Sequence, residues 1–193
     1  MKHALYPVLD TARLRVRLAE AHEAEHILAY YRRNEPHLRV WEPERPSGFF
    51  TTPFWKERIA LYTDQCLVGT SFRFFLFANT LSLQREVGMI VGSISLTQIE
   101  RGAFMCGRLG FSVDAAGEGR GLMREALDSV VDYGFQGVGL HRIEANHQPQ
   151  NLRSAALLRR LGFEIQGYAR DYLFVGGAWR DHVLTARTSS GHD

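Results

Sequence analysis

Residues 118–123 carry the pattern in this chain that is most suggestive of chemistry. They read Glu-Gly-Arg-Gly-Leu-Met and lie between an apolar strand-like run, 109–113, and an apolar helical run, 122–135. Closely spaced glycines let the backbone turn tightly, so that unpaired amide groups at the start of a helix converge on one anion, typically a phosphate. Taken alone, a simple strand-to-helix turn explains the same residues. We call this segment the glycine turn.

Two common nucleotide motifs do not fit the glycine turn. No Lys-Ser or Lys-Thr pair follows the glycines, as a P-loop requires, and the spacing is not that of a dinucleotide-binding fingerprint. A second polar block lies one helix and one strand further on, where Asn151 and Ser154 open an apolar helical run that ends at Gly162. Gly162 has the place of a C-terminal helix cap. The two blocks together make a functional site more probable than either does alone.

Composition bounds the class of protein. The 193 residues, 45% hydrophobic, suffice for a single domain over 1–193 with its core at about 10–188. The net charge of +2 and the lack of Lys or Arg runs argue against direct nucleic-acid binding. Cys66 and Cys106 are too few for a disulfide framework and are expected to be free thiols in a reducing cytoplasm.

Two further classes of site are not expected. No apolar stretch is long enough to span a bilayer, so we expect no membrane association. His22 and His26 are four residues apart on a predicted helix, but no third ligand accompanies them, so no metal site is expected. The sequence leaves the oligomeric state open.

Hydrophobic periodicity predicts the elements that must position these residues. Helices are expected at 20–33, 54–68, 122–135 and 151–161, and strands at 13–18, 72–77, 87–99, 104–113, 140–146, 163–175 and 179–187. Pro36 and Pro43 are expected to bound an aromatic loop around Trp41, and Gly176 and Gly177 to turn the last hairpin. This order predicts a mixed α/β or α+β domain with one central sheet.

The paired blocks resemble the GNAT superfamily of acetyl-CoA-dependent N-acetyltransferases. That family has a Q/R-x-x-G-x-G/A loop, followed later by a helix with N-x-x-S/A-x-x-L and the ending L-G-F, and the resemblance covers nearly the whole chain. Within it the chain looks closest to the RimJ/RimL-type ribosomal-protein-alanine N-acetyltransferases, in the branch that acts on the N-terminal alanine of protein S5. The supporting segments are 11–17, 41–43, 121–127, 167–173 and 179–186.

The resemblance implies a GNAT fold with about seven strands in a mixed sheet that splays at the acetyl-CoA site, flanked by about four helices. It implies that the backbone of 111–113 pairs with pantetheine and polarises the thioester carbonyl, while the glycine turn holds the pyrophosphate. The residues implied to bind acetyl-CoA are Phe111, Ser112, Val113, Glu118, Gly119, Arg120, Gly121, Leu122, Met123, Asn151 and Ser154.

Three positions depart from the family pattern. Glu118 replaces Gln or Arg, Met123 replaces a small residue, and Leu158 stands where this helix often carries a tyrosine acid. Ser154 is then the candidate donor to the leaving thiolate, or else a small residue packed against CoA. Glu144 is the candidate base, with a salt-bridge role on the strand face as the alternative.

The resemblance implies that the acceptor is a protein or peptide N-terminus, with a ribosomal protein as the candidate. Trp41, Glu42 and Tyr172 are the candidate substrate residues, with Glu42 attracting the protonated amine; a packed loop explains Trp41 and Glu42 equally well. Another Rim-type branch uses a Glu in the late hairpin, where this chain has Leu173. Two alternatives remain: a small-molecule amine acetyltransferase for a polyamine, antibiotic or peptide-nucleotide toxin, and a non-catalytic CoA-binding or ribosome-associated module.

Overall fold

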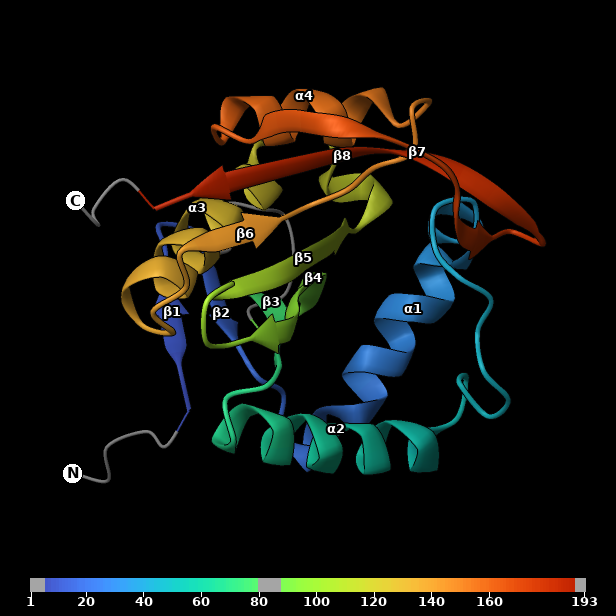
Figure 1. The fold of residues 1–193 in the computed structure, drawn as a ribbon. Helices are drawn as coiled ribbons and strands as arrows, with labels where there is room; N and C mark the ends of the chain where they lie inside the picture. The colour runs from blue at the N-terminus through green and yellow to red at the C-terminus, as the bar shows by residue number, and fades with distance from the viewer. Residues whose placement is uncertain (1–5, 80–87, 190–193) are drawn as a thin grey trace.

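A single mixed sheet organises the computed structural model, which describes residues 6–79 and 88–189 (Figure 1). Its strand order is β1-β2-β3-β4-β5-β6-β8-β7. Neighbouring strands are antiparallel except β5 and β6, which are parallel. The strands are β1 (Val8–Asp10), β2 (Leu14–Arg17), β3 (Phe72–Ala78), β4 (Ile90–Glu100), β5 (Cys106–Val113), β6 (Arg142–Glu144), β7 (Glu164–Val175) and β8 (Ala178–Thr188).

Helices cover both faces of this sheet (Figure 1). They are α1 (Ala24–Leu38), α2 (Thr52–Leu67), α3 (Leu122–Gln136) and α4 (Leu152–Arg160), with short 3₁₀ turns at Ala21–Glu23 and Ala115–Gly117. One apolar core, including Leu127 and Leu158, lies between the sheet and α3 and α4. The other is mainly aromatic and surrounds Trp55 beneath α1 and α2. No described helix combines the length and apolar character that crossing a membrane requires.

The sheet opens in its middle, between β5 and β6. The two strands pair only at three positions, the last of which joins Arg108 to Glu144. Beyond that point β5 continues to Val113, whereas the chain after β6 turns to β8, forming a bridge between His147 and Val183. Among the described residues, β5 therefore has no strand partner on its β6 side from residue 109 onward. This divergence is the splay that the resemblance implied, and it leads directly to the glycine turn.

The structure corrects two expectations. The sheet has eight strands, because Val8–Asp10 pairs with β2 although it is too short to show a period. Pro36 was expected to lie beyond the first helix, but α1 continues through it to Leu38. Pro36 costs the helix one backbone hydrogen bond near its end, and burial of Asn34 and Leu38 offsets that loss. The expected start of a strand at Val87, and the linker before it, fall at 80–87, outside the described residues.

Candidate active site

The glycine turn adopts a backbone that only glycine accepts readily. Gly119 and Gly121 have φ of 71° and 76°, in the left-handed region. A Cβ on Gly119 would meet no atom within 4 Å. Glycine is therefore needed at this position for its backbone conformation and not because neighbouring atoms are close. Gly121 precedes α3, and no side chain within the described residues caps that helix end. The first amides of α3 are therefore available to an anion.

Leu122 and Met123 contribute to this site only through their main chain. Their side chains are 2% and 6% exposed and belong to the core. A Cβ on Gly92 of β4 would lie 3.4 Å from the Met123 methyl and 2.8 Å from the Ser112 carbonyl oxygen. The Ser112 carbonyl, and not the Met123 methyl, is therefore the contact that excludes a side chain at this position.

Glu118 does not present an unopposed negative charge. Its carboxylate forms an ion pair with Arg153 of α4, and His37 Nε2 lies 3.5 Å from its other oxygen. Arg153 therefore connects the glycine turn to the helix that carries the second polar block. The departure at Glu118 is accompanied by a nearby cation that offsets its charge.

Helix α1 fixes the segment between β5 and the glycine turn. Arg33 Nε donates to the buried Asp114 carboxylate at 2.7 Å, and Asn34 Oδ1 accepts from the Ala115 amide at 2.9 Å. The second oxygen of Asp114 accepts from the Ala116 amide at 3.0 Å. Sequence reasoning did not single out these residues. They limit movement of the turn relative to the sheet.

Asn151 and Ser154 form the N-terminal cap of α4. Asn151 Oδ1 accepts from the Ser154 amide at 3.1 Å, which leaves the Asn151 amide group and the Ser154 hydroxyl for a ligand. Leu158, where the family often has tyrosine, is 1% exposed in the core. Leu158 thus contributes packing, and Ser154 stays the candidate donor on this helix.

A cluster of hydroxyl groups lies on the α1 face of β5. Ser112 Oγ is 3.0 Å from the Tyr30 hydroxyl and 2.9 Å from Ser93 Oγ. Burial raises the pKa of Tyr30 far above its ordinary value, so this phenol is neutral and cannot act as a base. The side chain of Ser112 therefore joins β5 to α1, while its carbonyl oxygen is directed toward Gly92 of β4.

Glu144 lies where β5 and β6 begin to diverge. Its carboxylate accepts a hydrogen bond from Arg142 Nε at 2.9 Å, and Arg108 Nε is 3.9 Å from the other oxygen. Asn146, two residues further on, donates from Nδ2 to the Tyr172 hydroxyl at 3.1 Å. Asn146 lies just beyond the end of β6. The candidate base is therefore close in sequence to a contact of Tyr172.

Tyr172 lies within a bulge of β7. Pairing with β8 is interrupted between Ala169 and Leu173, and Asp171 within the gap has φ of 44°. The Tyr172 ring packs 5.3 Å from His182. Asn146, which holds the Tyr172 hydroxyl, was not recognised from the sequence. Only its position after a short strand could have indicated it.

Trp41 and Glu42 follow α1. Glu42 forms an ion pair with Arg45, whose guanidinium lies 4.3 Å from the centre of the Phe49 ring. Trp41 is 38% exposed. Because Arg45 opposes the Glu42 charge, the attraction of Glu42 for a protonated amine is weakened, and the packed-loop interpretation gains support.

Comparison with known proteins identifies this architecture. The model of the acetyltransferase (GNAT) domain matches residues 13–164. The chain belongs to the GNAT acetyltransferase family. Acetyltransferases of this family take their acetyl group from acetyl-CoA, which is therefore the co-substrate of this GNAT enzyme.

Individual relatives narrow the resemblance to the Rim-type branch. The chain is 40% identical over 181 residues to the [ribosomal protein uS5]-alanine N-acetyltransferase of Escherichia coli, covering 94% of this chain and 90% of that protein. It superposes on the ribosomal-protein-S5-alanine acetyltransferase of Vibrio fischeri with a TM-score of 0.89 at 34% identity, covering 97% and 99% of the two chains. Mycobacterium smegmatis RimJ in complex with CoA-disulfide gives a TM-score of 0.85 at 27% identity over 94% and 87%. The expected GNAT fold and Rim-type resemblance are confirmed.

The site of this GNAT domain fits the donor. On the β6 side of β5, the backbone groups from residue 109 onward have no strand partner within the described residues, and the amides of pantetheine can supply hydrogen bonds to them. The left-handed glycines leave helix-terminal amides for the pyrophosphate. The individual donor and acceptor residues stay predictions, which the proposals below develop.

Proposed function

We propose that this acetyltransferase acetylates the N-terminal α-amine of a ribosomal protein that begins with alanine, as in uS5. One observation carries the proposal: the splay between β5 and β6 ends at the glycine turn in a chain 40% identical to a uS5-alanine N-acetyltransferase. We infer that the reaction takes place in the cytoplasm, where such proteins are made.

The chemistry of an α-amine suits a site with a modest base. A free α-amino group has a pKa of about 7.7–8.0 and a lysine about 10.4, so roughly a tenth of the former but under a thousandth of the latter is neutral near pH 7. In this proposal Glu144 accepts the amine proton directly or through water. Its contacts with Arg142 and Arg108 orient the carboxylate where the strands diverge.

The other groups act on the thioester. Acetyl-CoA supplies the acetyl group when bound, and the backbone amides of 111–113 polarise its carbonyl. In this proposal Phe111 and Val113 act through their main chain, and Ser112 supports the strand through its hydroxyl contact with Tyr30. Ser154 donates a hydrogen bond to the departing sulfur; a thiol has a pKa of about 8.5, so complete proton transfer is not required.

Tyr172 and the loop after α1 form the proposed path for the peptide. The Tyr172 hydroxyl, held by Asn146, is positioned to contact the first residue of the acceptor. Trp41 offers an exposed ring to the residues that follow the acceptor's N-terminus. Glu42 supports the loop that carries Trp41 through its ion pair with Arg45.

Mass spectrometry of acetylated products tests the proposal. Purified chain and acetyl-CoA are incubated with peptides copied from the uS5 N-terminus, with the same peptides beginning with proline, and with a panel of small amines. The expected result is one acetyl group on the alanine peptides alone. Acetylation restricted to small amines, or an absence of turnover with every acceptor, would contradict the proposal.

A further inference from the structure

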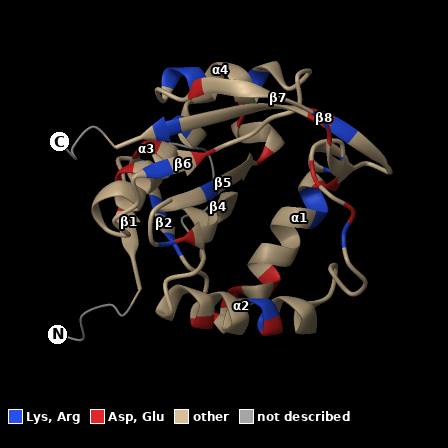
Figure 2. Ribbon diagram, in the orientation of Figure 1, with Lys and Arg blue, Asp and Glu red and all other residues tan. Residues whose placement is uncertain are grey.

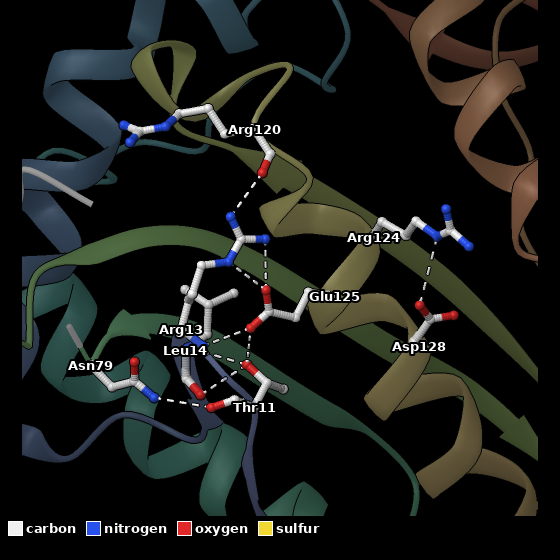
Figure 3. A network of polar contacts seen from close by, with 8 residues as sticks. All are labelled: Thr11, Arg13, Leu14, Asn79, Arg120, Arg124, Glu125 and Asp128. Carbon is white, nitrogen blue, oxygen red and sulfur yellow. Dashed lines mark hydrogen bonds and ion pairs between the residues drawn. The ribbon is translucent and has the colours of Figure 1, made fainter. Parts of the chain in front are cut away.

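The loop before β2 is joined to the first turn of α3 by a group of polar contacts that the reaction as described does not use (Figure 3). Glu125 Oε1 accepts from Thr11 Oγ1 at 2.6 Å and from the Arg13 amide at 2.7 Å. Glu125 Oε2 accepts from Arg13 Nε at 2.7 Å. We call Thr11, Arg13 and Glu125, with the Arg120 carbonyl, the Arg13 network.

The fourth member of the network belongs to the glycine turn itself. Arg13 Nη1 donates to the Arg120 carbonyl oxygen at 2.9 Å (Figure 3). In a planar trans peptide the carbonyl and the following N–H point in opposite directions. Holding the Arg120 carbonyl on Arg13 therefore directs the Gly121 amide to the side of the turn away from Arg13. A free peptide beside two glycines would otherwise rotate with little hindrance.

The charges in the network make Arg13 unsuited to bind phosphate itself. Its guanidinium is already engaged by Glu125 Oε2, through Nε and Nη2, and by the Arg120 carbonyl, through Nη1. Burial of Glu125 raises the pKa of its carboxyl, but the hydrogen bonds from Thr11 and Arg13 outweigh that effect and lower the pKa below its ordinary value. Glu125 is therefore ionised at neutral pH and keeps Arg13 occupied.

We propose that Arg13 and Glu125 are positioning residues that orient the Gly121 amide toward the pyrophosphate of CoA. They do so without touching the donor. The inference rests on the use of acetyl-CoA and goes beyond the proposed acceptor. It requires that damage to the network weakens donor binding while leaving the handling of the acceptor intact.

Calorimetric titration of the full chain with CoA, without acceptor, tests this inference. Arg13→Lys retains a positive charge but cannot reach Glu125 and the Arg120 carbonyl together, so the Kd for CoA is expected to rise about tenfold. Arg15→Lys is the matched control, because Arg15 forms the same type of pair with Asp10 on the adjacent strand and makes no contact with the turn. Its Kd is expected to stay within twofold of wild type.

A second pair of variants tests Glu125. Glu125→Gln is expected to raise the Kd for CoA about fivefold, since the amide cannot accept at both oxygens. Asp128→Asn, one turn along α3, alters only a 3.9 Å ion pair with Arg124 and is expected to have no effect. Should Arg13→Lys not fold, Thr11→Val removes one hydrogen bond from the same carboxylate and is expected to raise the Kd about threefold.

Steady-state kinetics separate positioning from general damage. For Arg13→Lys and Glu125→Gln, the KM for acetyl-CoA is expected to rise, with kcat at saturating donor and the KM for the acceptor unchanged. An unchanged Kd for CoA, or equal losses in kcat and in both KM values, would overturn the inference. A wild-type chain that binds CoA but ignores alanine peptides would contradict only the proposed function.

Discussion

The donor and acceptor sides of this site are constructed by different means. The donor side is main chain, held in shape by contacts from distant segments: Arg13 to the Arg120 carbonyl, and Arg33 to Asp114. The proposed acceptor side is made of side chains, including Tyr172 on a bulged strand. A site made of backbone tolerates changes of side chain, whereas a site made of side chains changes its specificity with each substitution. Glu118 and Met123 depart from the family pattern on the tolerant side.

The largest test of this contrast is Gly121→Val. Forcing valine into a φ of 76° costs about 1–3 kcal/mol and moves the amides of the turn, so we expect CoA affinity to fall about 100-fold by calorimetry. Gly102→Val is the control, because Gly102 has φ of 77° in the turn between β4 and β5. It should lose similar stability in thermal unfolding and retain CoA affinity. Equal affinities for both variants would refute a backbone-built donor side.

On the acceptor side, Glu144→Gln should have the next largest effect. Removing the proposed base is expected to lower kcat/KM for an alanine peptide about 30-fold at pH 7. The deficit should shrink toward pH 9, because an α-amine with a pKa of about 7.7–8.0 is then mostly neutral without help. A pH–rate profile measures this, with Glu164→Gln on exposed β7 as control. A deficit that is constant with pH would favour the salt-bridge role of Glu144.

Tyr172→Phe sharpens the comparison further. It removes the hydroxyl that accepts from Asn146 while keeping the ring against His182, so the acceptor KM is expected to rise about tenfold with the Kd for CoA unchanged. Tyr168→Phe, on the same strand, removes a hydroxyl bound to Asp181 and should leave both constants near wild type. If the two variants behave alike, Tyr172 does not contact the acceptor.

The smallest expected effect concerns Glu118. Glu118→Gln removes a negative charge beside the proposed phosphate position and releases Arg153, so CoA should bind about threefold more tightly, the scale of an exposed ion pair. Glu42→Gln, which loses the pair with Arg45, serves as the control for an unrelated carboxylate. Weaker CoA binding by Glu118→Gln would show that its charge instead supports the turn.

The features predicted from the sequence are those that depend on neighbouring residues. Gly119 and Gly121 indicate their own left-handed backbone, and the apolar spacing of 122–135 indicates the helix that follows. The final hairpin likewise follows from Gly176 and Gly177 at its turn. Local conformation sets each of these, so one segment of sequence is sufficient to predict it.

The features that were missed depend on residues far apart in the chain. Arg13 and Glu125 both lie in segments that support the family resemblance, yet their contact spans 112 residues and has no local signature. Asn146 contacts Tyr172 at the point where β7 bulges, between Ala169 and Leu173. Figure 2 makes a related point for charge: α2 carries both acidic and basic residues, whereas the ion pairs of Arg13 and Arg33 join segments far apart in the chain.

The opening between β5 and β6 has a consequence for the survival of the protein itself. An unpaired strand edge is a template for association with other chains, and here that edge lies inside the sheet. In the proposed binding mode CoA covers this edge, and a ligand at 100 times its Kd adds about 2.7 kcal/mol to folding stability. The supply of CoA in the cell should therefore govern how much of this enzyme resists aggregation and proteolysis, and starvation for CoA would deplete the catalyst together with its co-substrate.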